Sequence, residues 1–375
     1  MKKIIFAILI VVVVGVTTAM TLFRTQLDDQ VRKKVSKRVE AALEPVDCPP
    51  IQRTFPDSAY QGPLIDTHIH IAPVPDGPFG GSLDEEARPG MGVNVRVGDY
   101  VCMMDTENTK KVFAFFPVWE PIEEEFVQVV RETMETYPDR FVPFIMPPDH
   151  DDRKDGFPTV TAAALKNMLA IAPDLFQGYG EIGLYERKGG APELPPDSER
   201  LLEIYPVVRE HKLLVYVHLG EGQKESFERV LVANPDINFI WHGDQLIPYG
   251  KNKEQDLSAV EDILSQHPNA YYGVDELYGD IWLLRPEVSK EEFIAHFEDP
   301  ESLLEKDLAT WEGFIERHPK QVLWGTDRGW SAPWSLDRDV AIVLNNYSRM
   351  FIGRLDPSVQ ERFAYKNAEE LVSGQ

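Results

Sequence analysis

Short apolar runs alternate with amphipathic segments along most of the chain, from Leu64 to the C-terminus. After Pro121, for example, three consecutive glutamates precede Phe126, Val129 and Val130, a spacing that places the apolar residues on one face of a helix. The runs are short and almost continuously apolar, as in strands that are buried on both faces. The eight runs are Leu64–Ile71, Val112–Phe116, Phe141–Met146, Tyr179–Leu184, Leu213–His218, Ile237–His242, Ala270–Val274 and Val322–Asp327.

Eight such strands separated by helices predict an α/β fold in which a parallel sheet is covered by helices. The number favours a closed (β/α)8 TIM barrel over residues 64–375. A dinucleotide-binding fold is the alternative, but it requires a G-x-G-x-x-G turn after an early strand, and the sequence has none. The barrel region exceeds the usual length of roughly 250 residues. We therefore expect the surplus in two substrate-shaping loops, Ala72–Lys111 and Glu276–Leu308.

The N-terminus has a different pattern. Lys2 and Lys3 precede an uncharged, largely apolar run, Ile4–Phe23, which is long enough to cross a bilayer as a helix. This pattern predicts a transmembrane anchor over residues 1–23. The alternative is a cleaved signal peptide with a small-residue site that ends at Ala19.

The basic residues around this run bear on its orientation. The two lysines favour a cytoplasmic N-terminus and hence an extracytoplasmic catalytic domain, although several basic residues also follow the run, between Arg24 and Arg38. We expect a protein anchored in the membrane by one N-terminal segment. Cleavage of the segment would instead give a secreted or periplasmic protein.

Residues 24–63 connect the apolar run to the barrel. Apolar residues recur at every fourth position from Leu27 to Leu43, which predicts a helical stalk that ends at Pro45. A Pro-rich segment follows, which is either a linker or a segment that wraps the barrel. The stalk is either a solvated spacer with a packing edge, or a surface that lies on the membrane or pairs with a second copy of the chain, so a homo-oligomer is possible. Cys48 lies in the linker, and either a disulfide with Cys102 or two free thiols would be compatible with the sequence.

Composition narrows the range of partners. The chain has 62 acidic and 38 basic residues, a formal net charge of −24, which would repel a nucleic acid. With only 2 cysteines, the chain cannot form a disulfide scaffold or a multi-cysteine zinc module. We therefore expect a small-molecule substrate.

Polar residues lie at the C-terminal ends of the predicted strands, where barrel enzymes place their chemistry. His68 and His70 are two apart on a strand, so both side chains project to the same face and could bind one metal ion. For any single residue a structural role is the simpler interpretation, but the whole set favours a metal site. The candidate metal ligands are His68, His70, Glu181, His218, His242 and Asp327.

These residues lie in motifs that resemble the amidohydrolase superfamily. The motifs are IDTHIH at 65–70, GEIGL at 180–184 and GTD at 325–327, with histidines ending two strands between them. The strings YPDRF at 137–141 and FAYKNAE at 363–369 are similar to its amidohydrolase 2 branch of metal-dependent hydrolases. The resemblance covers most of the barrel region and implies its TIM-barrel fold.

The resemblance also implies how metal would be held. His68 and His70 would bind one divalent ion with Asp327 beside it, and His218 and His242 would bind a second. Glu181 takes the place of the bridging carboxylated lysine of many members, as in the TatD-type nucleases, and could bridge two ions. In the alternative, one ion is bound and His242 is kept for proton transfer. We expect zinc, with manganese or iron as other possibilities.

The implied activity is the hydrolysis of a small amide, lactone or other ester. A metal-activated hydroxide would attack, and the catalytic residues would be Asp327, which takes the proton and returns it to the leaving group, and His242. The alternatives are a metal-dependent decarboxylase and a catalytically silent, membrane-tethered binding protein. A nuclease is disfavoured by the net charge of −24.

Further polar and aromatic residues follow the strand ends. Trp119, Trp330 and Arg328 are candidates for binding substrate, and Asp275, after the seventh strand, is a candidate supporting residue. Arg328 either clamps a substrate carboxylate or pairs with a neighbouring acid.

Overall fold

The structure is a computed structural model. It describes residues 33, 39–40, 42–50, 55–71, 96–118, 123–148, 156–186, 192–243, 257–275, 277, 288–329 and 333–374. The anchor predicted over residues 1–23 lies outside these ranges. None of the helices within them has the length and apolar character that a bilayer crossing requires.

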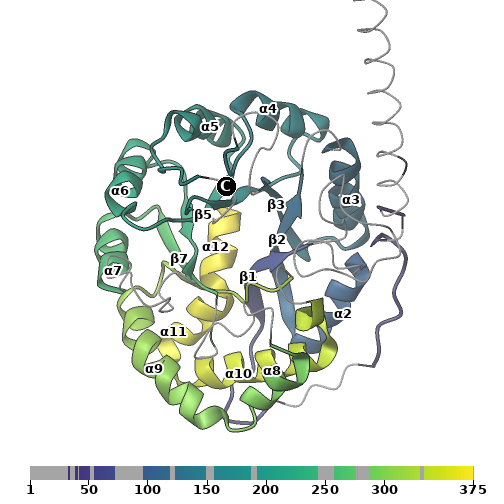
Figure 1. The fold of residues 1–375 in the computed structure, drawn as a ribbon. Helices are drawn as coiled ribbons and strands as arrows, with labels where there is room; N and C mark the ends of the chain where they lie inside the picture. The colour runs from purple at the N-terminus through teal and green to yellow at the C-terminus, as the bar shows by residue number, and fades with distance from the viewer. Residues whose placement is uncertain are drawn as a thin grey trace, which may run out of the picture.

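Eight parallel strands form one sheet in which neighbours in sequence are neighbours in space. Helices surround the sheet in a ring, so the fold is a TIM-like barrel, as the alternating pattern predicted (Figure 1). All eight predicted apolar runs are confirmed as strands. The strands are β1 Leu64–His70, β2 Thr109–Pro117, β3 Phe141–Met146, β4 Gly178–Gly183, β5 Leu214–His218, β6 Phe239–Trp241, β7 Ala270–Val274 and β8 Val322–Trp324.

The ring of strands closes where the segment after β8 meets β1. One parallel bridge joins Ile69 to Arg328, and the His70 amide donates a hydrogen bond of 2.8 Å to the Arg328 carbonyl. Gly329 follows with φ of 97°, and a Cβ there would lie 2.3 Å from the carbonyl oxygen of His70. Only glycine permits this close approach. The closure brings residues 327–329 beside the histidines of β1.

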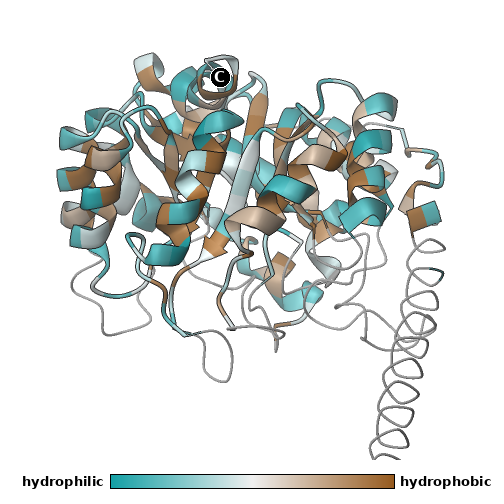
Figure 2. Ribbon diagram, turned by 90° about the horizontal axis from the view of Figure 1, so that it is seen from above, coloured by the Kyte–Doolittle hydropathy of each residue, from teal (hydrophilic) through white to brown (hydrophobic). Residues whose placement is uncertain are grey.

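Amphipathic helices cover the outside of the barrel. In α3, for example, Phe126, Val129 and Val130 are buried behind the acidic first turn. Figure 2 shows apolar positions turned towards the strands and polar positions turned outwards. The helices are α2 Val97–Glu107, α3 Glu123–Thr136, α4 Ala162–Ile171, α5 Glu199–Glu210, α6 Lys224–Ala233, α7 Leu257–Gln266, α8 Lys290–His296, α9 Pro300–Arg317, α10 Arg338–Arg354, α11 Pro357–Glu361 and α12 Asn367–Ser373, with η4 Pro333–Leu336 and η5 Arg362–Lys366.

The barrel interior is an apolar core that is closed at one end by α12, which lies in the middle of the ring in Figure 1. Ala368 and Leu371 of this helix pack against side chains of the strands. The Asn367 side-chain amide donates hydrogen bonds of 2.9 Å to the carbonyls of Pro319 and Val322, next to the start of β8. Because α12 closes the N-terminal end of the strands, polar chemistry is confined to the C-terminal end.

The two predicted surplus loops are partly helical, which corrects the prediction. Ala72–Lys111 contains α2, in which Tyr100 and Met104 are buried, and the first residues of β2. Glu276–Leu308 contains α8 and half of α9. In both segments apolar residues at helical spacing pack on the barrel, and this packing decides the structure.

The described part of the predicted stalk and linker packs on the barrel. Val39 and Ala42, at the end of the predicted stalk helix, are buried. A disulfide joins Cys48 to Cys102 of α2. Further along, the buried Arg349 of α10 donates a hydrogen bond of 2.9 Å to the Tyr60 carbonyl. The buried Val39 and Ala42 fit the packing edge expected of the stalk, and the contacts of Cys48 and Tyr60 fit a linker that wraps the barrel.

Candidate metal centre

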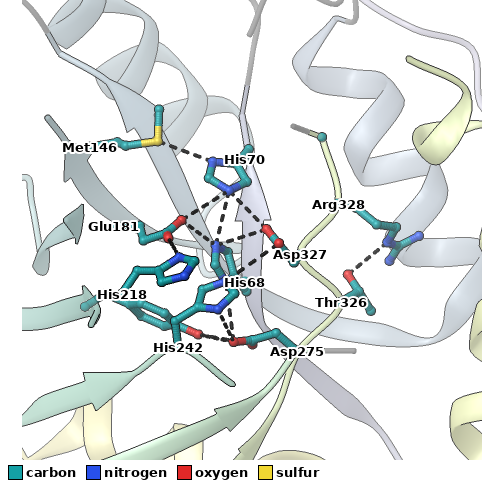
Figure 3. A network of polar contacts seen from close by, with 12 residues as sticks. His68, His70, Met146, Glu181, His218, His242, Asp275, Thr326, Asp327 and Arg328 are labelled. Carbon is teal, nitrogen blue, oxygen red and sulfur yellow. Dashed lines mark hydrogen bonds and ion pairs between the residues drawn. The ribbon is translucent and has the colours of Figure 1, made fainter. Parts of the chain in front are cut away.

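The six predicted ligands converge at the C-terminal end of the barrel (Figure 3). His68 and His70 lie on one face of β1, and Asp327 lies three residues beyond β8. Figure 3 shows the imidazoles and carboxylates pointing towards one another from opposite sides of the barrel mouth. The other three come from β4 (Glu181), the last residue of β5 (His218) and the residue after β6 (His242).

Three of these residues form a compact donor set. His68 Nε2, His70 Nε2 and Asp327 Oδ1 are 3.1–3.4 Å apart, and the side chains are almost completely buried. Ligand atoms about 2.0–2.1 Å from a tetrahedral zinc ion lie about 3.3–3.4 Å from one another. Two imidazoles and a carboxylate at this spacing fit a divalent metal ion.

A second donor set shares His68 with the first. It consists of His68, Glu181 and His242. Glu181 Oε2 lies 3.4 Å from His68 Nε2 and 3.6 Å from His70 Nε2, so this carboxylate reaches both histidines of β1. Because Nε2 of His68 has one lone pair, it can bind only one ion, which would draw its other ligands from either set.

His218 belongs to neither donor set. Its Nδ1 lies 2.7 Å from Glu181 Oε1, and its ring stacks on that of His242 with centroids 4.6 Å apart. The prediction that His218 binds metal therefore stays a prediction. With 12% of its side chain exposed, His218 lies nearer to solvent than His68 or His242.

The outer nitrogens of the imidazoles also face protein groups. Asp275, which follows β7, has Oδ2 at 3.6 Å from His68 Nδ1 and 3.8 Å from His242 Nδ1. His70 differs, because its Nδ1 lies 3.3 Å from the sulfur of Met146. In the sequence, Asp275 stands out only as a polar residue directly after a buried strand.

The electrostatics of the site favour a cation. Burial would lower the pKa of His68, but the Asp327 and Asp275 carboxylates outweigh it and raise the pKa to about 10. Burial would raise the pKa of Glu181, yet His242 and His218 hold it well below its usual range. Burial would likewise raise the pKa of Asp327, but the neighbouring imidazoles of His68 and His242 lower it below its usual range. The protein thus gathers ionised carboxylates around imidazoles, and a divalent ion can replace their protons.

Of the three predicted substrate contacts, Trp119 and Trp330 lie outside the described residues. Arg328 is buried, and its Nη1 donates to Glu107 Oε1 at 2.6 Å. Its Nε also donates to Thr326 Oγ1 at 2.9 Å. Of the two predicted roles of Arg328, the structure thus describes pairing with a neighbouring acid.

Comparison with known proteins agrees with this fold. The family model described as Amidohydrolase matches residues 65–373. No curated protein matches the chain in sequence.

Several solved structures match the chain at low sequence identity. A probable 2-pyrone-4,6-dicarboxylic acid hydrolase from Acinetobacter baumannii is 14% identical with a TM-score of 0.51, over 83% of this chain and 99% of the other. An amidohydrolase from Burkholderia multivorans with bound zinc is 12% identical with a TM-score of 0.52, over the same shares. A 2,6-dihydroxybenzoate decarboxylase from Rhizobium is 12% identical with a TM-score of 0.42, over 84% of this chain and 99% of the other.

Proposed function

The chain belongs to the amidohydrolase family, and from this premise we propose that it is a zinc-dependent hydrolase of a small amide, lactone or other ester. The observation that carries the proposal is the buried donor set of His68, His70 and Asp327 at the C-terminal end of the strands. A merely structural polar cluster would not need three ligand atoms at the spacing of a coordination shell.

A divalent ion bound to His68, His70 and Asp327 would supply Lewis acidity and would lower the pKa of a water molecule in this site. Residues of the protein then accept and donate the proton. Asp327 Oδ1 faces the two histidines of β1, whereas Oδ2 lies 3.6 Å from His242 Nε2. We assign to Asp327 the removal of the proton from the attacking water and its return to the leaving group. His242 would stabilise Asp327 while its carboxyl carries that proton.

Exposure indicates the side from which substrate approaches. The donor set is almost closed to solvent, and Glu181 and His218 keep 14% and 12% of their side chains exposed. A substrate carbonyl would therefore reach the centre past the Glu181–His218 pair.

Whether the reaction is a hydrolysis is tested with a panel of amides, lactones, esters and aromatic carboxylic acids in ¹⁸O-labelled water. Incorporation of one ¹⁸O atom into the product supports the hydrolase. Release of carbon dioxide without ¹⁸O incorporation would replace it by the alternative, a decarboxylase. No turnover on the panel by metal-loaded protein would favour a silent binding protein.

We further propose that residues 1–23 anchor the protein and that the barrel lies outside the cytoplasm. The disulfide between Cys48 and Cys102 supports this location, because disulfides persist in oxidising compartments. The test is thiol labelling of the full-length protein in intact cells, with and without reduction. Free, labelled thiols in the unreduced protein would contradict the location.

A further inference from the structure

Asp275 is completely buried at the end of β7, and its carboxylate faces hydrogen-bond donors. The Tyr216 hydroxyl donates to Oδ2 at 2.9 Å, and the Gly243 amide donates to the same oxygen at 3.3 Å. Oδ2 also lies 3.6 Å from His68 Nδ1 and 3.8 Å from His242 Nδ1. One carboxylate oxygen therefore faces two imidazoles that carry metal-ligand atoms on their other side.

The surrounding backbone leaves room for this carboxylate. A Cβ at Gly325 would lie 2.3 Å from Asp275 Oδ1, and a Cβ at Gly273 would lie 2.7 Å from Oδ2. Both distances are far below van der Waals contact, so a side chain at either position would displace the carboxylate. Glycine at residues 273 and 325, on β7 and directly after β8, thus allows a charged group into the barrel interior.

A buried carboxylate is costly unless it is hydrogen-bonded or paired. Tyr216 and Gly243 alone would satisfy Asp275 as a structural residue, but they do not account for its position between two imidazoles. An acceptor beside Nδ1 favours the imidazole tautomer that carries its proton on Nδ1 and leaves Nε2 free to bind metal. The Nε2 atoms of His68 and His242 are the ones that face Glu181 and Asp327.

We infer that Asp275 is a positioning residue that holds His68, the ligand shared by the two donor sets, and His242, a ligand of the second set, in the tautomer and orientation that bind metal. This inference rests on the proposed function, because it requires a metal ion in the site. Asp275 would thereby orient a ligand of each donor set. The other two histidines of the site have different neighbours, because His70 faces the sulfur of Met146 and His218 faces Glu181.

The test compares Asp275→Asn with a matched control, Asp307→Asn. Asp307 of α9 is also a buried acid that accepts a hydrogen bond from a tyrosine, Tyr347, at 2.7 Å, but it lies outside the six-residue site. Metal-free full-length protein is titrated with Co²⁺, and the dissociation constant and the visible d–d spectrum, which reports ligand geometry, are recorded.

We expect Asp275→Asn to weaken Co²⁺ binding by about 10–100-fold and to change the spectrum, as when other partners of metal-bound histidines are removed. Asp307→Asn should lower the melting temperature while it leaves the dissociation constant and the spectrum as in the wild type. Equal Co²⁺ affinity and identical spectra for Asp275→Asn and the wild type would overturn the inference and leave the proposed function intact. No Co²⁺ binding by the wild type would overturn the proposed function itself.

If Asp275→Asn does not fold, Tyr216→Phe is measured in the same way. This variant keeps the ring in the barrel core and removes the hydroxyl that fixes Oδ2. A shifted cobalt spectrum would support the positioning role, and a spectrum identical to that of the wild type would overturn it.

Discussion

At the scale of single residues, the two oxygens of Asp327 face different partners. Oδ1 lies 3.1 Å from His70 Nε2, whereas Oδ2 lies 3.6 Å from His242 Nε2. The backbone of Asp327 is left-handed, with φ of 47°, a conformation that aspartate adopts more readily than most residues. This turn after β8 aims the carboxylate back into the barrel mouth, where it can both bind an ion and exchange a proton.

The variant Asp327→Asn should separate these two roles. The amide oxygen can stay beside the ion, so metal content should fall little, but the amide cannot accept a proton. We expect turnover to fall by roughly 10²–10⁴, the usual effect of removing a general acid–base group. Metal analysis and turnover are measured on the same preparation, with the exposed Asp236→Asn as control. Near-normal turnover of Asp327→Asn would exclude Asp327 from the mechanism.

His68 should make the stability of the metal-free protein depend on pH. Asp327 and Asp275 outweigh the effect of burial and raise the pKa of His68 from 6.5 to about 10. Because folding favours the protonated form, this stabilisation is complete below about pH 6.5 and is lost as the pH rises to about 10.

The measurement is the free energy of unfolding in urea with a chelator present, between pH 6.5 and 10. The wild type should lose more stability over this range than His68→Asn, which lacks the titrating group. Parallel pH profiles of the two proteins would contradict the assignment.

The sequence was sufficient to find the residues on the strands but not their partners. His68, His70 and Asp327 could be predicted because each lies near or at the end of a recognisable apolar run, and strand ends meet in a barrel. The pairing of Arg328 with Glu107 could not, because it joins residues 221 positions apart. The same holds for Asp275, whose contacts depend on side-chain directions that no local pattern encodes.

At the scale of elements, α2 links the outer layer to the closure of the barrel. Its last residue, Glu107, accepts two hydrogen bonds from Arg328, at 2.6 and 3.1 Å, and Arg328 follows the candidate ligand Asp327 directly. Arg328 also lies 3.5 Å from Asp66 of β1. The position of α2 thus fixes the segment that carries Asp327.

Glu107→Gln should therefore be strongly destabilising. Loss of one partner leaves the buried Arg328 charge with weaker compensation, and breaking such a pair typically costs about 3–5 kcal/mol. The half-exposed pair of Arg354 and Glu301 is the matched control, and Glu301→Gln should cost less than about 1 kcal/mol. Chemical denaturation measures both. Equal, small losses for the two variants would show that the buried pair does not hold α2.

The prediction of elements failed where Gly/Pro-rich sequence adjoined a helix. The stretch 72–111 begins with many glycines and prolines, which predict a loop. Within it, however, Val97–Glu107 has buried residues at helical spacing. The strands could be predicted more readily, because a short, nearly continuous apolar run in an α/β chain is typical of a buried parallel strand.

At the scale of the whole molecule, the disulfide ties the linker to the barrel. Cys48 and Cys102 are 54 positions apart, and a cross-link of this span stabilises a protein by roughly 3–4 kcal/mol, mainly by restricting the unfolded chain. The double variant Cys48→Ser/Cys102→Ser should melt at a lower temperature than the wild type. A reductant should lower the melting temperature of the wild type and leave that of the variant unchanged. If the reductant has no effect on the wild type, the cross-link does not contribute to stability.

The central claim is that the barrel mouth binds a divalent metal ion through His68, His70 and Asp327. The most direct measurement is elemental analysis of purified protein, without a metal-affinity tag and after dialysis, for the wild type and for His68→Asn/His70→Asn. We predict one or two equivalents of zinc, or of manganese or iron, in the wild type and a large loss in the double variant. A wild type that holds no metal, even after incubation with zinc, or a double variant that holds as much as the wild type, would contradict the claim.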